Sequence, residues 1–224
     1  AWSLFFEYIA NILYAVIVRR FSKTLLTILV VLSACYLVQY LLMGPQGDLI
    51  GGWALNPTQL HIGFARVLYP FFAGVLLMRV GKLIHIKSAF LVCSLMLIVI
   101  FSVPRLGGTD QLWINGLYES VCIILFFPLI VSIGAGGSIT GKYSIKVCKF
   151  LGAISYPLYI THYPLIYLHI AWVTNNKVPI STGLWGGLVL LIVSVAIAYV
   201  SLKLYDEPVR KWLTERFLKK RAQN

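Results

Sequence analysis

Seven apolar runs, each close to the length that crosses a bilayer, most constrain what this chain of 224 residues can fold into. A helix needs about 20 apolar residues to cross the hydrocarbon core. The chain is 59% hydrophobic, whereas soluble domains are about 45–50% apolar. We therefore expect an all-α, polytopic membrane helix bundle of about seven transmembrane helices, as one domain over residues 1–224. The predicted spans are residues 2–18, 24–43, 62–80, 88–104, 112–134, 148–173 and 183–205.

The formal charge of +12 comes from basic residues that gather after alternate runs. Because Lys and Arg prefer the cytoplasmic side of a membrane, this alternation predicts an external amino end and a cytoplasmic carboxyl end. The same distribution argues against nucleic acid as a partner, since the charge does not cover a soluble surface. The groups predicted to be cytoplasmic are Arg19, Arg20 and Lys23; Arg79, Lys82 and Lys87; Lys142, Lys146 and Lys149; and Lys203, Arg210, Lys211, Arg216, Lys219, Lys220 and Arg221.

The four cysteines lie in or beside the apolar runs and show no CxxC spacing, and the four histidines are not clustered. Neither a disulfide framework nor a metal site is therefore expected. The sequence begins directly in an apolar segment, without an initiator Met or a charged leader. We expect it to be a piece of a longer chain, without a signal peptide.

Three ionisable groups lie inside predicted spans at a similar depth from the outer end: Arg66, Glu119 and Glu7. A charge at the centre of a span costs about 2.5–3.5 kcal/mol on insertion scales, so it usually faces a partner or a watery cavity. We expect Arg66 to pair with one or both carboxylates, in a substrate-binding or catalytic cluster. A structural ion pair, or side chains that reach toward the headgroups, would explain the pattern equally well.

The stretch ISYPLYITHYPLIYL, residues 154–168, carries two prolines and many hydrogen-bonding groups through a predicted span. His162 lies near the midplane, and Ser155, Tyr159 and His162 share one helical face at i, i+4 and i+7. Pro157 and Pro164 each remove a backbone donor. We expect this face to line a polar cavity, while the tyrosines at 156 and 163 pack against other helices. A neutral histidine hydrogen-bonded between helices is the plainer alternative.

The segment GAISYPLYITHYPLIYL closely resembles the G-x-x-S-Y-x-x-Y-x-x-H-x-P signature of the acyltransferase 3 family of membrane proteins. Three further segments resemble the same family in the same order along the chain: WSLFFEYIANILY, RVLYPFFAGVLL and YDEPVRKWL. Together the four segments extend the resemblance along the whole chain. The residues that match the signature are Gly152, Ser155, Tyr156, Tyr159, His162 and Pro164.

The resemblance implies transfer of an acyl group, most often acetyl from acetyl-CoA, to a hydroxyl of a carbohydrate or cell-surface glycan. The donor would be a substrate, with no cofactor bound. Family members have about ten helices, and an Arg and a His in the early helices are central to catalysis. This sequence begins after that region, so about three helices are expected to be missing and the fragment to be inactive alone. The resemblance also places the protein in a bacterial inner membrane.

The candidate catalytic residues are His162, Glu7 and Arg66, and the candidate substrate-binding residues are Ser155, Tyr159 and Glu119. Because the main catalytic His of the family lies upstream, we expect His162 to hold or polarise a substrate. Three lysines before its span, Lys142, Lys146 and Lys149, could attract CoA phosphates, although setting the topology explains them as well.

Two other functions fit the polar groups in the spans. A transporter or flippase for a glycan or a lipid-linked intermediate would bind cargo with the same side chains and perform no chemistry. A membrane scaffold or sensor would tolerate replacement of His162 and Arg66. The four family-like segments favour an enzyme over both.

Overall fold

The computed structural model describes residues 2–218, and these form helices and no β-strand. The expected all-α fold is confirmed. The chain divides into two compact units, Ala1–Thr140 and Gly141–Asn224. The first unit contains α1 (Trp2–Val16), the 3₁₀ turn η1 (Val18–Arg20), α2 (Lys23–Met43), α3 (Pro57–Val80), α4 (Ala89–Ser102), α5 (Leu112–Val121), the π-helical turn η2 (Cys122–Phe126) and α6 (Phe127–Gly136). The second contains α7 (Lys142–Asn175), α8 (Ile180–Ser201), the π-helical turn η3 (Leu202–Asp206), α9 (Glu207–Leu213) and η4 (Thr214–Leu218).

Four helical stretches in the described part of the chain are long and apolar enough to cross a membrane: Lys23–Met43, Pro57–Val80, Leu112–Gly136 and Ile180–Phe217. Two further apolar helices, Leu4–Val16 and Ala89–Ser102, are shorter. The longest α-helix, α7, has 34 residues but is not one of the four, because its tyrosines, prolines and histidines lower its hydropathy. Each predicted span coincides with one of these helices, and the count of seven spans stays a prediction.

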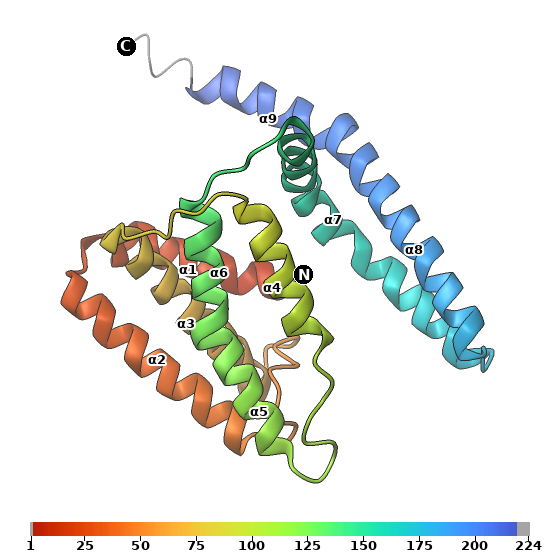
Figure 1. Cartoon of the computed structure of the whole chain (residues 1–224), viewed down its shortest axis with the longest axis horizontal. Coiled ribbons are helices and arrows are strands. Elements are labelled where there is room, and N and C mark those ends of the chain that lie inside the picture. The colour runs from red at the N-terminus through yellow and green to blue at the C-terminus, as the bar shows by residue number, and fades with distance from the viewer. Residues whose placement is uncertain (1, 219–224) are drawn as a thin grey trace. The chain divides into compact units, whose positions relative to one another are not determined.

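The first unit is built around α2, which packs against α3 and α5 (Figure 1). Leu26, Leu37 and Leu41 of α2 are fully buried. Glycine allows the close approach of α5, since a Cβ at Gly116 would lie 2.1 Å from the Leu41 carbonyl oxygen. The helix that contains Gly116 changes to π-helical geometry at η2, where Tyr69 donates its hydroxyl to the Ile124 carbonyl at 2.8 Å. That bond supplies a partner where the regular α-helical ladder is interrupted.

A second tie joins the end of α3 to the turn between α1 and α2. The guanidinium of Arg79 donates to the carbonyls of Val18 (3.1 Å), Arg19 (2.6 Å) and Phe21. Carbonyls at a helix end have no partner in their own helix, so a cation there satisfies them and the helix dipole together. Arg79 therefore has a structural role beyond setting the topology.

The second unit is a helical hairpin in which α7 and α8 lie side by side (Figure 1). Glycines of α8 face α7 at the contact: a Cβ at Gly186 would lie 2.9 Å from Cε1 of His169 and 3.0 Å from Cζ3 of Trp172. Small residues of this kind let helix backbones approach closely in membranes. Beyond α8 the helix continues as far as Leu218. The basic residues Lys219, Lys220 and Arg221, predicted to be cytoplasmic, lie outside the described residues.

Substitution Gly116→Ala is expected to lower the thermal unfolding midpoint of the protein in detergent, because the new methyl group meets a backbone carbonyl. Overpacking of this kind costs about 1–3 kcal/mol. The matched control is Gly74→Ala in α3, where a Cβ meets nothing within 4 Å and alanine gains about 0.5–1 kcal/mol of helix stability. Equal midpoints for the two variants would contradict the close contact between α2 and α5.

The predicted topology is tested by single cysteines at Ser138 and Asn176, two exposed positions, in a protein whose four native cysteines are replaced. The alternation of Lys and Arg predicts that a cysteine at 138 reacts with an impermeant maleimide only from the cytoplasmic side, and one at 176 only from outside. Labelling of both positions from the same side of intact cells would refute the seven-span arrangement.

Candidate functional site

A glycine-rich connector between α2 and α3, residues 44–56, packs against α3 within the first unit. Gly47, Gly51 and Gly52 have φ angles of 62°, 144° and 84°, a region that side chains with a Cβ rarely adopt. A Cβ at Gly52 would lie 3.1 Å from Cα of Gly63 in α3. Glycine is therefore needed both for the path of the connector and for its close approach to α3.

Two side chains of α3 hold this connector through its backbone. The Gln59 Oε1 accepts from the amides of Gly52 (2.7 Å) and Trp53 (3.0 Å), and the Arg66 Nη1 donates to the Gly51 carbonyl at 2.7 Å. Buried backbone groups outside secondary structure need such partners, because an unpaired group costs about as much as a lost hydrogen bond. The connector is thus ordered by α3.

Two carboxylates lie at the connector, Asp48 within it and Glu119 beside it on α5. The side chain of Asp48, only 6% exposed, pairs with Arg105 at 3.1 Å and accepts from the Ile50 amide at 3.1 Å. Half-buried Glu119 of α5 has Asp48, Arg105 and the backbone of Leu49 as its electrostatic neighbours. Arg105 therefore pairs with Asp48 and acts on Glu119 only through the longer-range electrostatic field.

The expected ion pair between Arg66 and a carboxylate is wrong. Arg66 forms no ion pair with Glu119 or Glu7 and bonds to the Gly51 carbonyl instead. Glu7 is exposed on α1, and among the described side chains its one partner is Asn11, whose Nδ2 donates to the Glu7 backbone carbonyl at 2.9 Å. Arg66 and Glu119 both lie at the connector, but at different points. The guanidinium of Arg66 bonds to the buried Gly51 carbonyl of the connector and therefore does not pair with Glu119.

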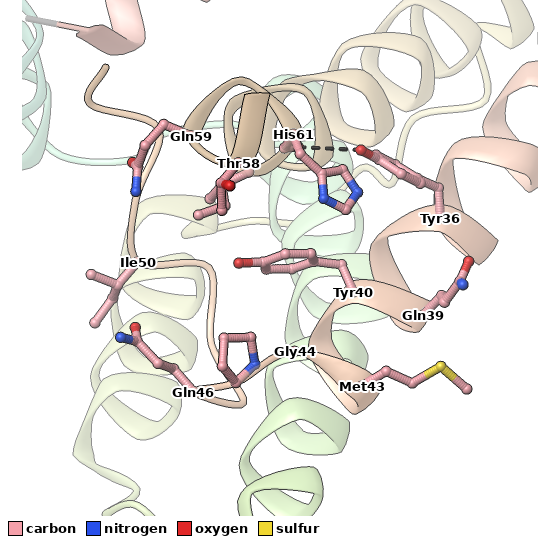
Figure 2. A pocket seen from close by; sticks show the side chains of 12 residues that line it. Tyr36, Gln39, Tyr40, Met43, Gly44, Gln46, Ile50, Thr58, Gln59 and His61 are labelled. Atoms are coloured by element: carbon pink, nitrogen blue, oxygen red, sulfur yellow. Dashed lines mark hydrogen bonds between the residues drawn. The ribbon is translucent and has the colours of Figure 1, made fainter. Parts of the chain in front are cut away.

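A pocket of about 610 Å³ opens beside the connector, between the end of α2 and the start of α3 (Figure 2). The ring of His61 lies between those of Tyr36 and Tyr40, with centroid distances of 5.1 and 5.3 Å. The Tyr36 hydroxyl donates to the His61 carbonyl at 3.2 Å. None of the twelve lining residues is Lys, Arg, Asp or Glu.

The sequence alone gives His61 no role. The pocket lies within the single stretch of residues 36–62, but it forms only when the connector brings the end of α2 and the start of α3 together. The one signal available in the sequence is local. The end of an apolar run carries Tyr36 and Tyr40 at i and i+4, with Gln39 next to Tyr40. This spacing places aromatic and amide groups at one end of a helix.

In α7 two signature residues, Ser155 and His162, and the adjacent Thr161 bond to carbonyls of their own helix. Ser155 Oγ donates to Gly152 at 2.9 Å, Thr161 Oγ1 donates to Pro157 at 2.8 Å, and His162 Nδ1 lies 2.8 Å from the Leu158 oxygen. A carbonyl can only accept, so the imidazole donates through Nδ1–H, and the neutral ring carries its lone pair on Nε2. These bonds do not go to the carbonyls of residues 153 and 160, which the two prolines leave without an amide partner.

The faces of α7 differ in part from those expected. Ile154 and Pro157 are buried, and Ser155 is exposed. The prediction that Tyr156 and Tyr163 pack against other helices is wrong, since they are 49% and 45% exposed. Tyr163 instead contacts its own helix, where its hydroxyl lies 3.3 Å from that of Tyr167.

The six candidate residues fall into both units. Glu7, Arg66 and Glu119 belong to the first, and Ser155, Tyr159 and His162 belong to the second. Within residues 2–218 there is no group of three or more His, Cys, Asp or Glu side chains placed to hold a metal ion.

A helical bundle with several helices able to cross a bilayer defines a polytopic membrane protein. A family model described as an acyltransferase domain matches residues 1–203 of the chain. The chain therefore belongs to the acyltransferase 3 family. Neither curated proteins nor solved structures give a match. Three of the four family-like segments lie inside the matched region, and YDEPVRKWL follows it.

Replacing Gln59 by Ala is expected to loosen the connector, because two backbone amides lose their acceptor. Hydrogen exchange at Gly52 and Trp53 should accelerate at least about fivefold, since each bond contributes about 0.5–1.5 kcal/mol. Mass spectrometry of the peptide over residues 44–56 measures the rate. The control is Gln39→Ala at an exposed position nearby, which has no bond to the connector backbone. Unchanged exchange in Gln59→Ala would show that the connector is held by other contacts.

Proposed function

We propose that the protein is a membrane O-acyltransferase that moves an acyl group, acetyl in particular, from acyl-CoA to a hydroxyl of a carbohydrate or cell-surface glycan. In this reaction the acceptor oxygen attacks the thioester carbonyl. A C–O bond forms, the C–S bond breaks, and the hydroxyl proton passes by way of a base to the leaving CoA sulfur. The reaction needs a proton acceptor near the hydroxyl and donors for the oxyanion.

The contact of His162 Nδ1 with the Leu158 carbonyl is the observation that supports the proposal beyond the family. Because its Nδ1–H is engaged by the Leu158 carbonyl, the neutral ring presents Nε2 as an acceptor. The hydroxyl protons of Ser155 and Thr161 are engaged by carbonyls as well. The lone pairs of these groups remain, and they suit an acceptor hydroxyl that must be held and polarised. We assign His162 this supporting role, with Ser155 and Tyr159 as substrate-binding residues.

The proposed arrangement separates donor and acceptor. Acyl-CoA is cytoplasmic, whereas cell-surface glycans lie beyond the membrane, so an enzyme in a bacterial inner membrane with a cytoplasmic carboxyl terminus would accept the acyl group from inside. In the predicted orientation, the connector held by Arg66 and the carboxylate of Glu119 lie on the outer side, where the glycan would bind.

Replacing His162 by Ala in the complete gene product is expected to lower acyl transfer at least about tenfold, a modest part of what a positioned proton-transfer group supplies. His162→Phe should restore nothing, because the loss is of a hydrogen bond and not of volume. Incorporation of labelled acetyl into cell-surface glycan measures transfer, with protein amounts matched by immunoblot.

The control for this experiment is Tyr163→Phe, which keeps the ring on an exposed face and should change transfer little. Near-normal incorporation in His162→Ala would reduce His162 to a structural residue. Export of glycan that depends on the protein without any incorporation of label would instead indicate a transporter.

A further inference from the structure

We propose that the pocket between α2, the connector and α3 is a binding site for a neutral sugar ring. The residues that line the pocket support this site by themselves. The further statement that this sugar is the acyl acceptor rests on the proposed function.

The size and construction of the pocket fit a small ligand. Its volume of about 610 Å³ lies inside the range of about 300–1,000 Å³ that is usual for small-molecule sites. The connector that forms one wall is held in place by Gln59 and Arg66. A pocket with an ordered wall loses less conformational entropy when a ligand binds.

The aromatic groups of the pocket suit the apolar faces of a sugar. The Tyr36 hydroxyl is fixed by its bond to the His61 carbonyl, and the Tyr40 ring is edge-on to the His61 ring. Figure 2 shows the Tyr40 side chain reaching across the pocket toward the connector. Rings of this kind offer a flat apolar surface together with a polar tip, which is what a ring of C–H and O–H groups needs.

The polar groups of the lining both donate and accept. Gln39 and Gln46 each present an amide with two donors and a carbonyl acceptor. The carbonyl of Gln59 is occupied by the connector, so this residue offers its NH₂ group. Sugar hydroxyls, which also donate and accept, match such a set.

The lack of charge in the lining decides the ligand class. Phosphates and carboxylates are bound chiefly by Arg and Lys, and none of the twelve lining residues is charged. The nearby arginines do not line the pocket: Arg66 donates to the Gly51 carbonyl, and Arg105 pairs with Asp48 and donates to the backbone carbonyl of Gln46. The pocket therefore does not suit the phosphates of CoA or an acidic sugar. In the predicted orientation it lies at the outer ends of α2 and α3, the side from which a glycan would arrive.

The test is saturation-transfer NMR on the purified protein in lipid nanodiscs, without any acyl donor. The probes are the neutral methyl glycosides of glucose, galactose, mannose and N-acetylglucosamine, with methyl glucuronide and adenosine 3′,5′-bisphosphate as charged counterparts. At least one neutral glycoside should bind saturably, and neither charged probe should displace it. Tyr40→Ala should weaken binding at least about tenfold through loss of stacking and a hydrogen bond. Gln39→Ala should weaken it about two- to tenfold.

The matched control is Tyr143→Ala, which removes a tyrosine that is 87% exposed in the other unit and should leave binding unchanged. Gln39 is exposed, so its replacement keeps the test valid even if Tyr40→Ala fails to fold. The proposal is overturned if no neutral glycoside binds, if a charged probe binds better, or if both pocket variants bind normally. Binding without acyl transfer in cells would refute the proposed function and leave the site, whereas transfer without binding would refute the site alone.

Discussion

Because a bilayer offers no water to solvate a bare amide or carbonyl, every backbone group that leaves a regular helix needs a partner from the protein. In the first unit, α3 supplies several of these partners. Gln59 and Arg66 satisfy the connector, Tyr69 satisfies the π-helical turn η2, and Arg79 satisfies the turn after α1. One helix thus ties three irregular segments together, and the pocket exists because its first tie holds the connector in place.

This requirement also changes how Arg66 is understood. A guanidinium at membrane depth is usually attributed to an ion pair or to function, but a bond from a charged donor to a buried carbonyl contributes about 1.5–3 kcal/mol by itself. The Gly51 carbonyl, fixed by a backbone that only glycine adopts easily, is such an acceptor. Charge at depth therefore pairs here with backbone, and the carboxylate of Glu119 lies beside Asp48 and Arg105 instead.

Sequence alone predicted the helices well because long apolar runs leave few alternatives: the start of each predicted span lies within about six residues of a helix start. The last helix was predicted to end at residue 205, but it continues, aided by the i,i+4 pairs Lys203–Glu207 and Arg210–Asp206.

The candidate site was harder to predict. Depth in a span does not define a partner, so the predicted pairing of Arg66 is wrong. His61 carries no signal in the sequence because its pocket forms only when the connector folds between the end of α2 and the start of α3.

The hydrogen bonds inside α7 also limit which chemistry this helix can support. A side chain that donates its only proton to a carbonyl of its own helix has only lone pairs left for a ligand. This holds for Ser155, Thr161 and the neutral form of His162. While these bonds are in place, such groups can accept a hydrogen bond but do not donate one to a developing oxyanion. For the acyl transfer proposed above, these bonds favour a place for His162 beside the acceptor hydroxyl, with other groups as the oxyanion donors.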